Sequence, residues 1–181
     1  EHSGPDWHVQ DGGNDVSGNG SVEYPFATIQ HALNSSLDGG EIYVDAGTYY
    51  ENIIWPEDKT GVQLIGEDSE TTIIDGSNTD RVMVISNIDE ASSISGFTLT
   101  NGSVAWNGGV AGLYISRSDL TVENLRITGN TGGTGGVEVS AASPHFKNVL
   151  ISNNIGEYAG GAYINGYWDP AHPIFENVTI V

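Results

Sequence analysis

A short motif recurs four times in the second half of the sequence. It is written SGFTLTNG at 95–102, ENLRITGN at 123–130, KNVLISNN at 147–154 and ENVTIV at 176–181. The steps between copies are 28, 24 and 29 residues, measured at the first apolar position of each: Phe97, Leu125, Val149 and Val178. A fixed period in the range of 20 to 50 residues indicates a solenoid, a propeller or another repeat array. The repeat therefore limits the possible folds more than any other feature of the chain.

Two further motifs recur between these copies. One is written GLYIS at 112–116, GVEVS at 136–140 and GAYIN at 161–165, and the other SDLTV at 118–122, SPHF at 143–146 and HPIF at 172–175. Each period of about 25 residues thus holds three short strands separated by Gly, Asn and Ser turns. No unit contains a helix-length segment, as a leucine-rich repeat requires, and the period is too short for a propeller blade. The pattern predicts an all-β fold, a right-handed parallel β-helix with three strands per coil.

Alternation along the strands predicts which side chains face the core. The inward columns are Phe97/Leu99, Leu125/Ile127, Val149/Ile151 and Val178/Ile180 on one sheet, and Leu113/Ile115, Val137/Val139 and Ala162/Ile164 on another. The outward residues are Thr98, Arg126, Leu150 and Thr179 on the first sheet, and Tyr114, Glu138 and Tyr163 on the second.

Asparagine recurs at the coil corners. Asn124, Asn148 and Asn177 occupy one corner position, where an earlier coil has Gly96. Asn and Gly tolerate left-handed backbone, and stacked Asn side chains can hydrogen-bond along the solenoid axis. A second column after the strand is predicted from Asn101, Asn130 and Asn154. We interpret both columns as corners rather than as a metal or sugar site.

The first third of the chain is less regular. Strands are expected within 41–53, 62–66, 71–76 and 81–86, and the stretch 25–40 has amphipathic helical spacing at Phe26, Ile29, Ala32, Leu33 and Leu37. The sequence predicts a single domain over 1–181. Residues 1–40 would supply a strand, a loop and a capping helix, and residues 41–181 about six coils.

No capping pattern follows the last strand motif, VTIV, at 178–181. An uncovered coil exposes an apolar cross-section and a strand edge. We expect either further coils in a longer protein or a homodimer that forms through this C-terminal edge strand.

Charge excludes one class of partner. The chain has 24 acidic and 5 basic residues, a formal net charge of −19. Nucleic-acid binding depends on clustered Lys and Arg, so no nucleic-acid partner is expected. No stretch approaches the roughly 18 apolar residues of a membrane span, so no membrane span is expected. The sequence has no Cys, so disulfides give no information on the compartment.

The beginning of the chain resembles a known family. DWHVQDGGNDVSGNGSVEYPFATIQHAL at 6–33 and GGEIYVDAGTYYENI at 39–53 are similar to the capped start of right-handed β-helix proteins of the pectin-lyase-like superfamily. With TIIDG at 72–76 and the later coils, the likeness covers nearly the whole chain. It is closest to secreted bacterial β-helix-repeat proteins, which implies a secreted or cell-surface location. The superfamily includes lyases, hydrolases and binding or display modules, so the fold does not specify an activity.

The resemblance defines a test for catalysis. A lyase like the pectate or alginate lyases would use a Lys or Arg base beside calcium held by Asp or Glu. The five bases are Lys59, Arg81, Arg117, Arg126 and Lys147. Arg126 alone is placed on an outward sheet, between Thr98 and Leu150, without an acidic trio. No catalytic residue is predicted. The sequence leaves the enzyme question open and leans toward a protein without activity.

Two features suggest binding. The loop at 11–20 offers the oxygen ligands Asp11, Asn14, Asp15 and Asn19, which makes calcium possible, although the order matches no recognised calcium loop. No other cofactor is expected. Aromatic residues at equivalent turns or on one outward column could stack against a polysaccharide, and the candidate glycan-binding residues are Trp106, Tyr158, Tyr114 and Tyr163. Tyr167 and Trp168 add aromatic rings on a neighbouring loop. The same rings could instead shield glycine-rich turns.

Three functions remain open from the sequence. The favoured one is a non-catalytic extracellular or cell-surface module for display or for binding glycans or partners, within a larger protein. The alternatives are a calcium-assisted uronate lyase and a scaffold that self-associates through the C-terminal edge.

Overall fold

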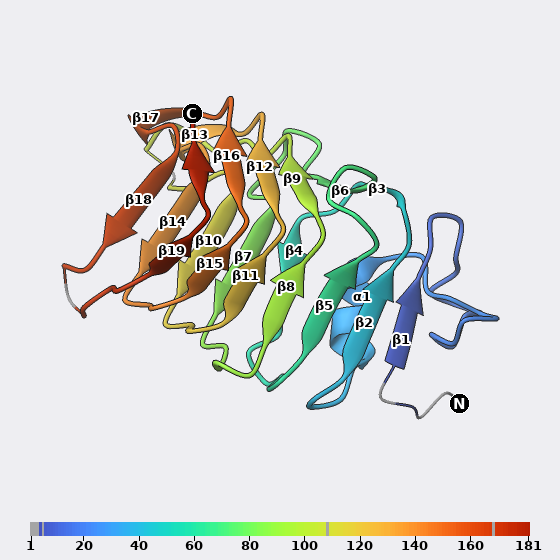
Figure 1. Ribbon diagram of the computed structural model, residues 1–181. Coiled ribbons are helices and arrows are strands. Elements are labelled where there is room, and N and C mark those ends of the chain that lie inside the picture. Colours follow the sequence, from blue (N-terminus) through green and yellow to red (C-terminus); the bar gives the residue numbers. More distant parts are fainter. Residues whose placement is uncertain (1–3, 5, 108, 168) are drawn as a thin grey trace.

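In the computed structural model, the chain coils into a right-handed parallel β-helix of about six turns with three parallel sheets (Figure 1). The structure describes residues 4, 6–107, 109–167 and 169–181. The predicted fold class is confirmed. Every strand pair between coils is parallel, and each strand contacts the equivalent strand of the next coil.

The strands form three long sheets and one short one. The seven-stranded sheet contains β1 (Asp6–Val9), β2 (Glu41–Val44), β5 (Gln63–Gly66), β8 (Ser93–Ser95), β11 (Thr121–Glu123), β15 (His145–Lys147) and β19 (Ile174–Glu176). The six-stranded sheet contains β3 (Gly47–Tyr49), β6 (Thr72–Asp75), β9 (Thr98–Thr100), β12 (Arg126–Thr128), β16 (Leu150–Ser152) and β20 (Thr179–Ile180). The five-stranded sheet contains β4 (Ile53–Ile54), β7 (Met83–Ser86), β10 (Leu113–Ser116), β14 (Val137–Ser140) and β18 (Ala162–Asn165). The fourth sheet pairs β13 (Thr131–Thr134) with β17 (Ile155–Ala159).

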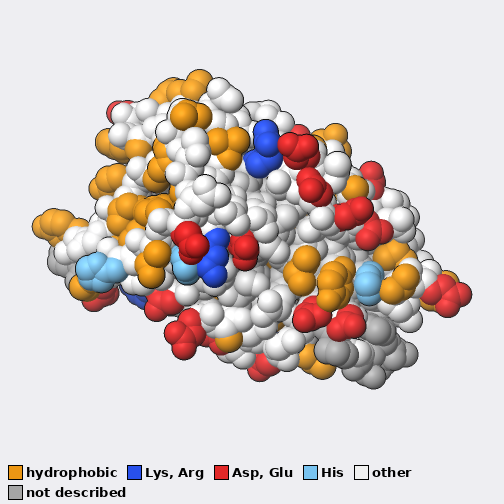
Figure 2. All heavy atoms as spheres, viewed as in Figure 1, with side chains coloured by type: hydrophobic (Ala, Val, Ile, Leu, Met, Phe, Trp, Pro, Cys, Tyr) orange, Lys and Arg blue, Asp and Glu red, His pale blue; other side chains and the backbone are white. Residues whose placement is uncertain are grey.

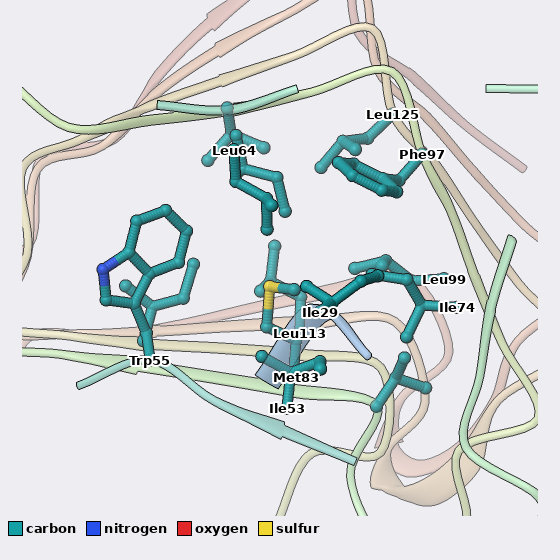
Figure 3. Close-up of a cluster of buried hydrophobic side chains, with 14 of the residues drawn as sticks. Ile29, Ile53, Trp55, Leu64, Ile74, Met83, Phe97, Leu99, Leu113 and Leu125 are labelled. Atoms are coloured by element: carbon teal, nitrogen blue, oxygen red, sulfur yellow. The ribbon is translucent and has the colours of Figure 1, made fainter. Parts of the chain in front are cut away.

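The core lies between the three long sheets. Apolar side chains from all of them meet at the axis, as Figure 3 shows for Leu64, Phe97 and Leu113. The predicted inward columns are confirmed up to Ile151, which is fully buried. In the last coil, Val178 packs only partly against the core, and Ile180 is 49% exposed. Burial of an inward residue therefore depends on a coil stacked on each side of it.

Thr98 has the predicted outward orientation but is covered by a neighbouring turn. The side chain points away from the core, yet it is only 8% exposed, because its hydroxyl donates to the Ser69 carbonyl at 2.5 Å. The turn between β5 and β6 folds over it.

The asparagine corners are confirmed for the first column. Asn124, Asn148 and Asn177 have φ values of 51°, 52° and 52°, and Gly96 has 79°. Asn177 Nδ2 donates to Asn148 Oδ1 at 2.7 Å, and Asn148 Nδ2 donates to Asn124 Oδ1 at 3.3 Å. The amide ladder thus stabilises a corner whose backbone conformation most residues avoid.

The second predicted column is confirmed for Asn130 and Asn154, which occupy equivalent positions, and is wrong for Asn101, which lies one position earlier in its coil. The left-handed positions after the strand are Asn101, Gly129 and Asn153, with φ of 55°, 71° and 54°. Asn130 and Asn154 follow them and serve a different role: Asn130 is fully buried and donates through Nδ2 to Asn154 Oδ1 at 3.0 Å. These two side chains therefore satisfy backbone and amide groups inside the turn.

The helix α1 (Ile29–Ser35) covers the first coil, beside β1 and β2 in Figure 1. Thr28 caps its N-terminus by accepting from the His31 N–H, and Ile29 and Leu33 are fully buried. The predicted helical stretch 25–40 was too long. Leu37, predicted on its apolar face, lies beyond the helix and is 58% exposed. Among the described residues, no helix is long and apolar enough to cross a membrane.

Candidate binding site

The outward face of the five-stranded sheet presents two columns of side chains. In-register pairing aligns the first as Ile54, Val84, Tyr114, Glu138 and Tyr163. The second is aligned as Ser86, Ser116, Ser140 and Asn165. Neighbouring coils are about 4.8 Å apart, so Tyr114 and Tyr163 flank Glu138 at a mutual separation of about 10 Å. This face therefore combines aromatic rings, one carboxylate and a row of small polar residues.

A loop at 103–110 borders this face. It is attached at both ends to β13: the Val104 N–H donates to the Thr131 carbonyl at 3.1 Å, and the Thr134 N–H donates to the Gly109 carbonyl at 3.1 Å. Isolated bridges join Ser103 to Thr131 and Val110 to Thr134. Backbone hydrogen bonds to β13 therefore hold the loop that carries Trp106 against the sheet.

The glycines of β13 make this attachment possible. A Cβ on Gly132 would lie 2.6 Å from Val104 Cγ2, and one on Gly133 would lie 2.6 Å from the Trp106 carbonyl oxygen. Both distances are too short for side-chain contact, so only glycine lets the loop approach this closely. The stretch 129–136, whose glycine-rich composition is typical of a turn, instead contains the strand β13. Tyr158 likewise lies on a strand, β17, rather than in a turn. Its position in the coil is nevertheless equivalent to that of the Trp106 loop, as predicted, because both segments pair with β13.

A pocket opens between the loop, β17 and the sheet. It has a volume of about 230 Å³ and is lined by Asn107, Gly109, Thr134, Glu138, Tyr158 and Tyr163. Tyr158 is 69% exposed and Tyr163 is 43% exposed. Both rings therefore offer apolar surface to a ligand, and the amide, hydroxyl and carboxylate groups offer hydrogen bonds.

Glu138 has an unusual electrostatic environment. Burial raises the pKa of its carboxyl above the ordinary value, and the positive charge of Arg81 opposes this effect. Arg81 lies just before β7, and its guanidinium group lies beside Gly109 of the pocket lining: a Cβ added to Gly109 would be 3.0 Å from Arg81 Nη2. It also forms a 3.9 Å ion pair with Asp80. The sequence did not predict this proximity of Arg81 and Glu138, because Arg81 precedes its strand and follows no alternation rule.

Two of the four predicted glycan-binding residues line this pocket. Tyr158 and Tyr163 come together there, while Tyr114 lies beside Glu138 on β10 and is half-buried. Trp106 is 51% exposed and precedes Asn107 of the lining, without lining the pocket itself. Tyr167 is 80% exposed, and Trp168 lies outside the described residues. Glu138, Asn107 and Thr134 were not predicted as binding residues.

Three other basic residues have structural neighbours. Lys59 Nζ donates to the Ser36 carbonyl at 2.7 Å, and Arg126 Nη1 lies 3.4 Å from Glu70 Oε1. Lys147 lies in register between acidic residues of β11 and β19. Arg117 is exposed at a corner with φ of 47°. In register, Arg126 pairs with Thr98 and Leu150, which confirms the neighbours predicted for it.

Two histidines, His31 and His145, have side-chain partners. His31 packs edge-on against Phe26 at a centroid distance of 4.4 Å, and His145 Nε2 lies 3.2 Å from Glu176 Oε2. Both rings therefore stabilise local packing.

Three of the four candidate ligands in the loop at 11–20, Asn14, Asp15 and Asn19, accept hydrogen bonds from neighbouring groups of the fold. Asp15 accepts from the Ala27 N–H at 2.7 Å and from the Thr28 hydroxyl at 2.6 Å, and Asn14 Oδ1 accepts from the Val16 N–H at 2.8 Å. Within the described part of the chain, no three His, Cys, Asp or Glu residues are arranged to hold a metal ion. Asp15 of this loop thus holds the residues that immediately precede the capping helix α1.

The fold is shared with solved structures. A pectin methylesterase from carrot is similar with a TM-score of 0.56 and 17% identity, over 83% of this chain and 53% of that one. A pectin methylesterase from Erwinia chrysanthemi gives 0.50 and 14%, over 80% and 54%. A pectin methylesterase solved in complex with a hexasaccharide gives 0.52 and 15%, over 80% and 54%.

These similarities show that the chain has a pectin-lyase-like β-helix fold. The chain spans about half the length of the pectin methylesterases it resembles. At this level of identity the likeness concerns the fold alone. No family model and no curated protein matches the sequence.

Proposed function

We propose that this chain is a non-catalytic, secreted or cell-surface β-helix module that binds a glycan in the pocket between β14, β17, β18 and the loop at 103–110. The supporting observation is that two exposed tyrosines and three polar side chains line one pocket of about 230 Å³. Aromatic rings stack on the apolar faces of sugars, while hydroxyl, amide and carboxylate groups satisfy sugar hydroxyls. The likeness to a pectin methylesterase solved with a hexasaccharide supports a sugar ligand for a site on this fold.

A calcium-assisted uronate lyase remains the alternative enzyme function. The observation that favours it is that Arg81, a residue type that acts as base in such lyases, lies beside Gly109 of the pocket lining and lowers the pKa of the Glu138 carboxyl by its charge. Incubation with uronate polymers and calcium, followed by ultraviolet absorbance of unsaturated products, distinguishes this alternative from binding alone. The binding proposal expects no increase in absorbance.

The proposal is tested by glycan-array screening followed by titration calorimetry on the best ligand. Tyr158→Ala and Tyr163→Ala should each weaken binding about 2- to 10-fold, the range expected for one aromatic contact. Tyr50→Ala is the matched control, because Tyr50 is 73% exposed in an early coil, outside the lining of the pocket. Equal affinity of all four proteins for the ligand would refute this location of the site.

A further inference from the structure

One ionised side chain lines the candidate pocket. Among the described residues that form its wall, Glu138 carries the single formal charge, and the others are neutral at physiological pH. Arg81 lies nearby, but it does not line the pocket, and its Nη1 forms an ion pair with Asp80 Oδ1 at 3.9 Å. The pocket is thus locally acidic, in a chain whose net charge is −19.

The carboxylate of Glu138 has free acceptor capacity. It accepts no hydrogen bond from the described residues, whereas Glu51, the other glutamate whose pKa burial raises, accepts two. Tyr114 and Tyr163 occupy the adjacent positions in register on either side of Glu138. An ionised carboxylate only accepts hydrogen bonds, so a ligand here must bring donors.

The geometry leads to a specific ligand class. We propose that the pocket selects a sugar unit bearing an ammonium group, as in glucosamine oligomers, with the ammonium on Glu138 and the ring against Tyr158 and Tyr163. The inference rests on the proposed function and names the ligand of that site. An ammonium group gives charge-assisted hydrogen bonds to a carboxylate and is attracted to tyrosine rings. A uronate would instead place a second anion beside Glu138.

The field of the whole molecule favours the same choice. An acidic protein attracts cationic ligands and repels anionic ones, although this effect is screened by salt and lacks specificity. The pocket adds the specificity, because Glu138 is placed between aromatic rings at one point of the surface. The effect of the overall charge and the effect of Glu138 can be separated by removing one carboxylate inside the pocket and, in a second variant, one carboxylate beside it.

The test compares three oligosaccharides of one length. Glucosamine and N-acetylglucosamine oligomers differ only in the acetyl group on the amine, and a galacturonate oligomer carries a carboxylate and no amine. Affinities are measured by calorimetry on the complete 181-residue chain, at a pH where the sugar amines are protonated. The wild-type chain should bind the glucosamine oligomer at least about tenfold more tightly than the acetylated one, since an ionic hydrogen bond contributes that much. Glu138→Gln should remove this preference while preserving the shape of the pocket.

Glu157→Gln is the matched control. Glu157 is exposed on β17 beside Tyr158 but does not line the pocket, so its removal changes net charge equally. It should retain the preference for the glucosamine oligomer. Equal losses in both variants would assign the preference to the overall field and overturn the role of Glu138. Matching urea midpoints of the three proteins confirm that each variant is folded.

The remaining outcomes separate the two proposals. If the acetylated or galacturonate oligomer binds as tightly as the glucosamine oligomer and Tyr158→Ala weakens it, the site stands and the ammonium inference fails. If no oligosaccharide binds, the proposed function fails, and the inference fails with it. A lysine oligomer that binds as tightly as the glucosamine oligomer, unaffected by Tyr158→Ala, would also overturn selection by the pocket.

Discussion

The first and last coils use the same inward pattern, with opposite burial. Ile42 in β2 is fully buried beneath α1 and the next coil, whereas Ile180 in β20 is 49% exposed and Phe175 in β19 is 42% exposed. In Figure 2, hydrophobic side chains gather at the end where the last strands lie, and acidic side chains are frequent elsewhere on that face. The alternation rule thus predicts direction, while stacking decides burial.

The two halves also differ in charge and in the groups that join their coils. Residues 1–90 contain 18 acidic and 2 basic residues, a net charge of −16, and residues 91–181 contain 6 and 3, a net charge of −3. Carboxylates of the first half accept backbone N–H groups, as Asp38 does from Thr60 at 3.0 Å. The later coils use the asparagine ladder instead. The irregular coils are therefore joined by ionisable groups and the regular ones largely by neutral amides.

The largest expected effect tests the difference in burial. Ile42→Ala should lower the free energy of unfolding by about 2–5 kcal/mol, because it leaves a cavity in the core. Ile180→Ala should cost less than about 1 kcal/mol, since half of the side chain is already in water. Urea denaturation of both variants measures the difference.

If Ile42→Ala and Ile180→Ala lower the free energy of unfolding equally, Ile180 is buried in solution. A homodimer through the C-terminal edge strand, one of the two alternatives expected from the sequence, predicts such burial at high protein concentration. Light scattering over a concentration range, with Ile180→Lys as the comparison, separates this case: a dimer that the lysine disrupts supports pairing, and a monomer in both proteins contradicts it.

The carboxylate contacts provide the next prediction. Asp15 accepts from the N–H groups of Ala27 and Thr28 and from the Thr28 hydroxyl. Among the described residues, Asp119 accepts only from the Ser143 N–H, at 2.7 Å. Asp15→Ala should therefore lower stability by about 3 kcal/mol and Asp119→Ala by about 1 kcal/mol. Thermal unfolding at neutral pH compares them. A smaller effect at Asp15 would show that the capping helix is held mainly by its buried apolar side chains.

The asparagine ladder predicts a smaller change in the later coils. Asn148→Ala should cost about 1–2 kcal/mol, because alanine is strained at a φ of 52° and both ladder bonds are lost. Asn148→Gly restores the backbone freedom and should cost less than the alanine variant. If glycine and alanine are equally destabilising in chemical denaturation, the amide bonds rather than the conformation account for the preference for Asn.

These contrasts show what the sequence could predict. The period of about 25 residues, the inward columns and the left-handed asparagines are local patterns, and each is repeated. The fold could therefore be predicted from the sequence alone. Strand β13 was missed because its glycines indicate a turn, while the reason for them is the close approach of Val104 and Trp106. The pocket joins Asn107, Glu138 and Tyr158 from three coils through loop packing, which alternation does not encode.

The smallest expected effect concerns pH and compares two carboxyls of the acidic half. Hydrogen bonding from the Ser92 hydroxyl is the main cause that lowers the pKa of Asp89, so its contribution to stability is present above the unfolded-state pKa and is lost as pH falls. Burial raises the pKa of Glu51 despite the bonds from Ile29 and Gln30, so the folded state retains its proton longer. Stability linked to Glu51 therefore falls as pH rises from its unfolded-state pKa through the raised one.

The two variants should consequently change the pH profile in opposite directions. Asp89→Asn should reduce the loss of stability on acidification, and Glu51→Gln should reduce the opposing loss as the pH rises above the ordinary glutamate range. Urea midpoints measured from acidic to neutral pH give both slopes. Asn148→Gly serves as the control, because it changes no ionisable group and should shift the whole profile without altering its slope. Parallel profiles for all four proteins would show that neither carboxyl differs in pKa between the folded and unfolded states. The contrast between ionisable and amide contacts would then have no consequence for pH dependence at these two positions.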